Sequence, residues 1–166
     1  MGCKALFIGG IKSGKSKNAE DYTLALSHDK PIYLATNEFF DAEMKERVLK
    51  HKKQRQDSFE TKEEALYLHN IIKKTDKVVL IECVSMWINN MLFHELSEQD
   101  MLDEIKSLCL LENEIVFVIN DVSCSIVSEN KLTRKFVDIN GRISQLLAKN
   151  AQEVYNTIAG ISIKIK

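Results

Sequence analysis

The sequence has almost no excess of charge and no long apolar run, and each absence excludes a class of protein. Its 23 Lys and Arg residues nearly balance 24 Asp and Glu residues, so the formal net charge of −1 gives no reason to expect a nucleic-acid partner. No stretch stays apolar over a membrane-spanning length, and no signal peptide is recognised. We therefore expect a cytoplasmic protein with no membrane span.

Paired cysteines, repeats, linkers and low-complexity tracts are absent as well. Cys3, Cys83, Cys109 and Cys124 form no C-x-x-C pair, and none has an adjacent histidine. This spacing argues against a zinc site and against a disulfide framework, so we expect the four cysteines to be thiols in the core. A chain of 166 residues suits one domain, which we expect to span residues 1–166.

The sequence does contain a glycine-rich loop between an apolar run and a helical pattern. Residues 5–16 read ALFIGGIKSGKS and hold the pattern G-x-x-x-x-G-K-S from Gly9 to Ser16. Backbone N–H groups can replace the hydration of a phosphate only where the chain wraps closely around it, which glycine permits. Lys15 would then place its charge on the β- and γ-phosphates, and Ser16 would offer its hydroxyl to Mg²⁺. The motif predicts a nucleotide site; the alternative is a glycine-rich turn without a ligand.

The rest of the chain alternates β-rich runs with helical patterns. After the first apolar run, we expect strands at residues 32–36, 77–83, 114–121, 153–158 and 161–166, and helices at residues 17–27, 41–56, 63–73, 84–96, 100–111 and 132–148. Residues 58–61 look irregular, and the strand at 32–36 is expected beside the first strand. The alternation predicts an α/β fold similar to the P-loop NTPases: a doubly wound, mostly parallel sheet with helices on both faces and a C-terminal β-hairpin.

Polar residues stand where several of these strands end. Ligands of such a sheet bind at the carboxyl ends of its strands, where Thr36, Glu82 and Asp121 fall. Glu82 follows four apolar residues, a placement that suits an acid that binds a metal ion or orients water. A carboxylate near Lys15 and Mg²⁺ would gain charge partners. A helix N-cap or a solvated strand end is the alternative interpretation of Glu82.

A histidine stands among basic residues on the expected helix at 41–56. At 3.6 residues per turn, His51 shares a face with Arg47 and Arg55. Nearby cations lower the pKa of an imidazole, which favours its neutral, nucleophilic form, and the same cations would hold a triphosphate. A catalytic histidine is one interpretation, and a solvated basic helix face is the other.

Several segments, spread from about residue 4 to residue 166, together resemble one known family. They are GGIKSGKS at 9–16, YLAT at 33–36, D-x-E-M-x-x-R-x-x-x-H-K-x-x-R at 41–55, F-x-T-x-E at 59–63, IEC at 81–83, NDV at 120–122, ENKLTRKFVDINGR at 129–142 and GISIKIK at 160–166. The combination resembles the bifunctional adenosylcobinamide kinase and adenosylcobinamide-phosphate guanylyltransferase of cobalamin biosynthesis. The chain departs from that family at residues 121–128, where glycines and a proline are usual, at Gln56, where proline is usual, at Phe59, where tryptophan is common, and at Lys12, where arginine is common.

The resemblance implies two reactions. ATP or GTP, with Mg²⁺, would phosphorylate the aminopropanol hydroxyl of adenosylcobinamide, and GMP from GTP would then pass to that phosphate through a guanylylated histidine, which matches His51. It also implies a small-molecule corrinoid substrate and a homotrimer. The implied catalytic residues are His51 and Lys15. The implied nucleotide-binding residues are Gly9, Gly10, Ile11, Lys12, Ser13, Gly14, Lys15, Ser16, Ala35, Thr36, Asn37, Lys52, Lys53, Gln54, Arg55, Glu63 and Glu82, with Ser16 and Glu82 at the metal.

Two other classes of function stay open. A phosphate-loop kinase that acts on a different small alcohol would keep Lys15, Ser16 and Glu82 but would need no nucleophilic histidine. A nucleotide-binding regulatory protein would bind GTP without turnover. The fate of GTP on incubation with the protein and Mg²⁺ separates all three.

Overall fold

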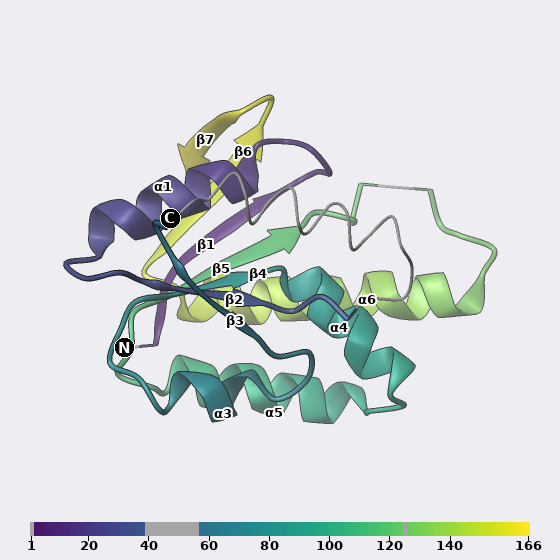
Figure 1. Cartoon of the computed structure of the whole chain (residues 1–166). Helices are drawn as coiled ribbons and strands as arrows, with labels where there is room; N and C mark the ends of the chain where they lie inside the picture. Colours follow the sequence, from purple (N-terminus) through teal and green to yellow (C-terminus); the bar gives the residue numbers. More distant parts are fainter. Residues whose placement is uncertain (1, 39–56, 125) are drawn as a thin grey trace.

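A computed structural model describes residues 2–38, 57–124 and 126–166 of the chain. One seven-stranded sheet runs through these residues in the order β3-β2-β4-β5-β1-β6-β7 (Figure 1). All neighbouring strands from β3 to β6 are parallel, and only β6 and β7 pair antiparallel. The strands are β1 (Cys3–Gly9), β2 (Ile32–Ala35), β3 (Glu60–Glu63), β4 (Val79–Glu82), β5 (Ile115–Asn120), β6 (Glu153–Ile158) and β7 (Ile161–Lys164). This sheet confirms the predicted α/β fold with a C-terminal hairpin.

Helices cover both faces of the sheet (Figure 1). They are α1 (Lys15–Leu26), α3 (Leu68–Ile72), α4 (Val84–Phe93), α5 (Glu98–Cys109) and α6 (Lys131–Asn150). Successive side chains of a strand point to opposite faces, so neighbours in β1 enter different apolar clusters. Leu6 packs in the cluster that holds Trp87 of α4 and residues of α5 and α6. Phe7 packs in the cluster that holds Ala19 of α1. Burial on both faces explains why the central strands are continuous apolar runs.

The expected position of β2 is wrong. β2 does not lie beside β1, because β4 and β5 lie between the two strands. β2 pairs instead with β3 on one side and with β4 on the other. An apolar run shows that a strand is buried, but its pattern does not say which strand is its neighbour.

The segment between residues 58 and 73 also differs from expectation. Residues 60–63 form the edge strand β3 instead of an irregular segment, and the helix starts only at Leu68. Glu63 therefore ends a strand, where it is in register with Ala35 of β2. The sequence of β3 is wholly polar and charged, so the backbone pairing with β2, rather than any apolar pattern, makes it a strand.

The cysteines are only partly the core thiols that we expected. Cys3 and Cys83 are buried and Cys109 is half-buried, whereas Cys124 is exposed in the segment after β5. The prediction is wrong for Cys124 because its segment passes over the surface before α6. The helix expected at 41–56 lies outside the described residues. Among the residues that are described, no helix has the combination of length and apolar character that crossing a membrane requires.

Candidate nucleotide-binding site

The glycine-rich loop lies between β1 and α1, in the strand-loop-helix context that the motif predicts. Gly14 adopts a φ of 95°, and a Cβ atom at this position would stand 2.9 Å from the Cα of Gly160. Both the positive φ and the close approach require glycine. Lys15 is 6% exposed, and its Nζ donates a hydrogen bond of 3.1 Å to the carbonyl oxygen of Gly10. The ammonium group therefore lies folded against the loop that precedes it.

The turn between β6 and β7 supports this loop. The backbone N–H of Gly160 donates to the carbonyl oxygen of Ser13 at 2.7 Å. Asn18, on the first turn of α1, donates from Nδ2 to the carbonyl oxygen of Gly160 at 3.0 Å and to Oγ of Ser162 at 2.8 Å. The glycine turn was predicted from the sequence, but this contact was not. Its partners lie more than 140 residues apart, and no local pattern records such a pairing.

A hydroxyl and a carboxylate meet beside the lysine. Ser16 Oγ donates a hydrogen bond of 2.8 Å to Oε1 of Glu82, which is the last residue of β4. The structure thus brings together the two residues that the sequence analysis assigned to a metal. Both offer hard oxygen atoms, and Mg²⁺ in nucleotide sites binds one or two protein oxygens together with phosphate oxygens and water. The donor set at Ser16 and Glu82 fits that ion.

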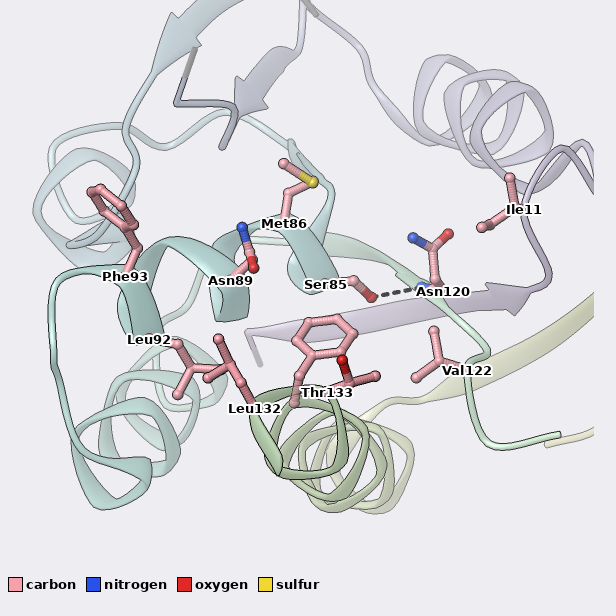
Figure 2. A pocket seen from close by; sticks show the side chains of 11 residues that line it. Ile11, Ser85, Met86, Asn89, Leu92, Phe93, Asn120, Val122, Leu132 and Thr133 are labelled. Carbon is pink, nitrogen blue, oxygen red and sulfur yellow. Dashed lines mark hydrogen bonds between the residues drawn. The ribbon is translucent and has the colours of Figure 1, made fainter. Parts of the chain in front are cut away.

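A cavity of about 590 Å³ opens beside the loop, between α4, α6 and the end of β5 (Figure 2). Ile11, from the loop, stands at one side of the cavity, and Asn120, the last residue of β5, stands near it. The residues that line the cavity are Ile11, Ser85, Met86, Asn89, Leu92, Phe93, Asn120, Val122, Leu132, Thr133 and Phe136. This cavity was not predicted from the sequence, because its residues come from four separate segments.

The carboxyl ends of three neighbouring strands align with one another. Ala35 of β2 is in register with both Glu63 of β3 and Glu82 of β4. The next residue, Thr36, is fully buried, and its Oγ1 donates to the carbonyl oxygen of Cys83 at 2.9 Å and accepts from the N–H of Cys83 at 3.0 Å. Thr36 therefore joins the ends of β2 and β4. Asn37 follows it and is half-buried.

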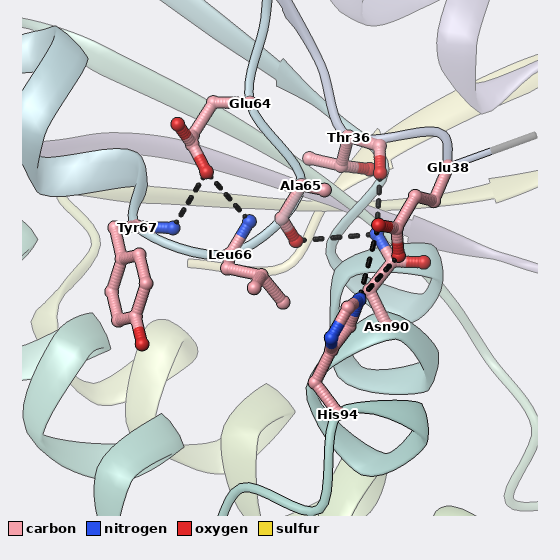
Figure 3. Close-up of polar contacts among 8 residues, drawn as sticks. All are labelled: Thr36, Glu38, Glu64, Ala65, Leu66, Tyr67, Asn90 and His94. Atoms are coloured by element: carbon pink, nitrogen blue, oxygen red, sulfur yellow. Dashed lines mark hydrogen bonds and ion pairs between the residues drawn. The ribbon is translucent and has the colours of Figure 1, made fainter.

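Asn90, on α4, ties together the segments that follow β2 and β3 (Figure 3). The side chain is fully buried, and its Nδ2 donates to the carbonyl oxygen of Thr36 at 2.5 Å and to that of Ala65 at 3.2 Å. Near the end of the same helix, His94 Nε2 lies 2.8 Å from a carboxylate oxygen of Glu38. Asn90 was not predicted from the sequence as a functional residue. A buried asparagine within an apolar helix is the signal that could have found it, because such a side chain needs hydrogen-bond partners.

Cys83 follows Glu82 but does not supply a nucleophile to this site. Burial raises the pKa of the Cys83 thiol to about 11, and the neighbouring carboxylate of Glu82 contributes in the same direction. A thiol with this pKa stays protonated near neutral pH, and the thiolate is the nucleophilic form. Cys83 is therefore a structural residue.

The structure thus gathers part of the predicted site. The loop from Gly9 to Ser16, the end of β2 and Glu82 all lie at the carboxyl edge of the sheet, and Glu63 lies at the same edge on β3. Asp121 also lies there, with its N–H donating to the carbonyl oxygen of Gly9 at 2.9 Å. The remaining predicted residues, His51, Lys52, Lys53, Gln54 and Arg55, lie outside the described residues.

Comparison with known proteins shows which family carries this loop and sheet. A family model described as cobinamide kinase / cobinamide phosphate guanyltransferase matches residues 5–165. The chain belongs to this family. Its family relatives include the bifunctional adenosylcobalamin biosynthesis protein CobU of Escherichia coli, 35% identical over 97% of this chain and 98% of the relative. CobU of Salmonella typhimurium is 36% identical over the same shares.

A further relative agrees with the family assignment, and one solved structure agrees with the fold. The bifunctional adenosylcobalamin biosynthesis protein CobP of Pseudomonas aeruginosa is 31% identical over 97% of this chain and 96% of the relative. Among solved structures, the flagellar accessory protein FlaH from Methanocaldococcus jannaschii superposes with a TM-score of 0.51 at 13% identity. That match covers 98% of this chain and 76% of FlaH, and it supports the fold alone.

Proposed function

We propose that the chain, as one nucleotide-binding domain, phosphorylates the aminopropanol hydroxyl of adenosylcobinamide and then guanylylates the product. The second reaction would transfer GMP from GTP to adenosylcobinamide phosphate, giving adenosylcobinamide-GDP and pyrophosphate. One observation carries the proposal: in a chain of this family, the glycine-rich loop places Lys15 and the Ser16–Glu82 pair together at the carboxyl edge of the sheet. We place the reactions in the cytoplasm, where their nucleoside triphosphates are made.

The kinase step needs positioning and charge rather than a protein nucleophile. The backbone N–H groups of the loop and the N-terminus of α1 would bind the phosphates. Lys15 would exchange the carbonyl oxygen of Gly10 for phosphate oxygens, as its flexible side chain allows. Ser16 and Glu82 would hold Mg²⁺, which when bound neutralises charge on the β- and γ-phosphates. The substrate hydroxyl would approach from the side of β4 and β5.

The guanylyltransferase step is proposed to run through His51. An imidazole nitrogen would attack the α-phosphorus of GTP, so that an N–P bond forms, the bond to the pyrophosphate oxygen breaks, and the imidazole proton passes to solvent. A phosphate oxygen of adenosylcobinamide phosphate would then attack the same phosphorus and release the histidine. This relay replaces one displacement between two anions by two attacks, the first of which uses a neutral nitrogen. The H-K-x-x-R segment at residues 51–55, which matches the family, supports the assignment.

The covalent step is tested by mass spectrometry after incubation with GTP and Mg²⁺. We expect an adduct of one GMP on the wild-type protein, labile in acid and stable in base as a phosphoramidate should be, and no adduct on His51→Ala. His69→Ala and His94→Ala serve as matched controls that should still form it. The His51→Ala variant should keep part of its kinase activity. An adduct that persists in His51→Ala would place the nucleophile elsewhere, and phosphorylation without any adduct in the wild type would identify a kinase only.

The phosphate site is tested by Lys15→Ala. We expect both activities to fall by about 10²-fold or more, because each reaction needs a cation on the triphosphate oxygens. Steady-state rates of nucleoside diphosphate release and of pyrophosphate release measure the two steps separately. Kinase turnover at the wild-type rate in this variant would show that the loop is not the site.

We further propose that the chain assembles as a homotrimer, as the family resemblance implies. One surface supports self-association: Ile161, Ile163 and Ile165, at alternate positions of β7 and the residue after it, are 59–68% exposed. Alternate residues of a strand share one face, so these side chains form an apolar strip on the edge of the sheet.

A further inference from the structure

The cavity beside the phosphate loop lies where an acceptor substrate would have to approach. Ser85 lies three residues after Glu82, at the start of α4, and Asn120 ends β5. Glu82, which accepts a hydrogen bond from Ser16, ends β4, and β4 pairs with β5. Ile11, in the loop itself, forms part of the cavity wall (Figure 2). The cavity therefore borders the phosphate loop at Ile11.

The lining of the cavity selects a neutral molecule. None of its eleven residues carries a formal charge, so the phosphates of a nucleotide would lose their hydration there without gaining a cation. Most of the wall is apolar, with the hydroxyl and amide groups of Ser85, Asn89, Asn120 and Thr133 placed among the apolar side chains. Such a lining complements a ligand that carries methyl groups and carboxamides.

The rim of the cavity exposes large apolar side chains. Ile11, Phe93 and Leu132 are 81%, 64% and 63% exposed, although they come from three different segments. Exposed apolar side chains that gather around a cavity usually mark a binding site, since burial against a ligand is favourable by roughly 25 cal/mol per Å². The cavity volume of about 590 Å³ lies within the roughly 300–1,000 Å³ usual for small-molecule sites.

A hydrogen-bonded network holds the floor of the cavity in place. Ser85 Oγ donates to Oδ1 of Asn140 at 2.7 Å and accepts from the N–H of Asn120 at 3.0 Å. Asn140 Nδ2 in turn donates to the carbonyl oxygen of Asn120 at 3.0 Å. Ser85 and Asn140 are 3% and 2% exposed, so the network joins α4, β5 and α6 from inside. The cavity is therefore preformed rather than a gap between mobile surfaces.

We propose that this cavity binds one edge of the corrinoid acceptor, with the methyl and carboxamide substituents of that edge. The inference rests on the proposed function, because it takes its ligand from the kinase reaction. A corrin ring with all of its side arms is larger than the cavity, so the ring enters by an edge and the aminopropanol arm extends past Ile11 toward the phosphate loop. The nucleotide, which is charged, stays outside.

The test compares two glutamate substitutions at exposed leucines. Leu132→Glu puts a charge on the rim of the cavity, and Leu110→Glu puts one at another exposed position away from it, on the residue that follows α5. Both leucines are mostly exposed, so both variants should fold. Binding of adenosylcobinamide is measured by equilibrium dialysis with its visible absorbance as the signal, and binding of ADP is measured in parallel by calorimetry.

We expect Leu132→Glu to weaken adenosylcobinamide binding by about tenfold or more and to raise the KM for the corrinoid, with unchanged ADP affinity. Leu110→Glu should match the wild type in each measurement, and Leu132→Met should retain corrinoid affinity. Wild-type corrinoid affinity in Leu132→Glu would overturn the cavity assignment while the proposed function stands. A change in assembly mass with unchanged corrinoid affinity would assign this rim to a subunit contact and also overturn it. Failure of the wild type to bind adenosylcobinamide would remove the proposed function itself.

Discussion

At the scale of single residues, Glu153 shows how one carboxylate can join three elements. It accepts hydrogen bonds from Lys164 Nζ on β7 at 2.8 Å, from the Tyr155 hydroxyl on β6 at 2.7 Å and from the Tyr22 hydroxyl on α1 at 2.8 Å. These donors, Lys164 foremost, lower the pKa of Glu153 to about 2. Burial and the hydrogen bond to Glu153 raise the pKa of Tyr155 to about 12. The ring of Tyr155 also stacks on Phe7 of β1 at 4.7 Å between ring centroids, so this cluster links α1 to the sheet.

We expect Glu153→Gln to destabilise the protein near neutral pH by about 1 kcal/mol, an amount kept small because the side chain is 26% exposed and solvent screens its contacts. The folded pKa lies below the usual 4.5, so the carboxylate stabilises the fold above pH 4.5. That contribution is lost as the pH falls from 4.5 toward 2. Urea unfolding of the wild type and of Glu153→Gln at a series of pH values measures the free energy of unfolding of each. A difference between the two free energies as large at pH 2 as at pH 7 would contradict this prediction.

At the scale of elements, the β6–β7 hairpin acts as a support for the phosphate loop. Gly14 and Gly160 lie so close together that a Cβ on Gly14 would stand 2.9 Å from the Cα of Gly160, and the hydrogen bond from Gly160 to Ser13 joins the hairpin turn to the loop. The loop needs fixed N–H groups to bind phosphate, so its geometry depends on the last two strands of the sheet. We therefore expect the β6–β7 hairpin to affect nucleotide binding through the position of the loop.

We expect Gly14→Ala to lower both stability and ADP affinity. A methyl group at this position forces an unfavourable positive φ and meets the Cα of Gly160 at 2.9 Å, which should cost about 1–3 kcal/mol of stability. The matched control is Gly141→Ala, in the middle of α6, where a Cβ would meet nothing within 4 Å and the higher helix propensity of alanine should add about 0.5–1 kcal/mol. Thermal unfolding with and without ADP measures both variants. Equal melting temperatures and ADP affinities for Gly14→Ala and the wild type would show that the β6–β7 hairpin does not support the phosphate loop.

At the scale of the whole molecule, the sheet has two different edges. β3 at one edge is polar and charged, reading ETKE, which is typical of an edge protected from pairing with another chain. β7 at the other edge carries the isoleucine strip of Ile161, Ile163 and Ile165. Charged side chains usually protect an edge strand from pairing with another chain, whereas this strip exposes apolar side chains. The asymmetry supports an assembly that uses the β7 side.

We expect Ile163→Lys to convert the proposed trimer to smaller species, because a charge in the centre of the strip would be buried without a partner on assembly. Leu110→Lys, at a highly exposed leucine outside the strip, is the matched control and should keep the wild-type mass. Sedimentation velocity over a range of concentrations measures the mass of each. A wild-type mass for Ile163→Lys would place the subunit contact elsewhere.

Short-range sequence patterns determined the phosphate loop and most of the secondary structure of this protein. The loop from Gly9 to Ser16, the alternation of apolar strands with helices, the C-terminal hairpin and the place of Glu82 at the end of β4 were all predicted from the sequence, and the structure shows them. Each depends on residues within a few positions of one another: glycines that permit a tight loop, or side chains repeated at the period of a helix or strand. Such constraints act between residues that are close to one another in the sequence.

Only the tertiary structure decided the order of the strands, the existence of β3, the hydrogen bonds of Asn90, the contact between Gly14 and Gly160, and the cavity beside Ile11. The residues of β3 carry no apolar pattern, and the other features join segments from distant parts of the chain. Periodicity along the sequence tells which face of an element is buried but not what packs against it. That pairing depends on how all the elements bury their apolar surface and satisfy their buried polar groups together.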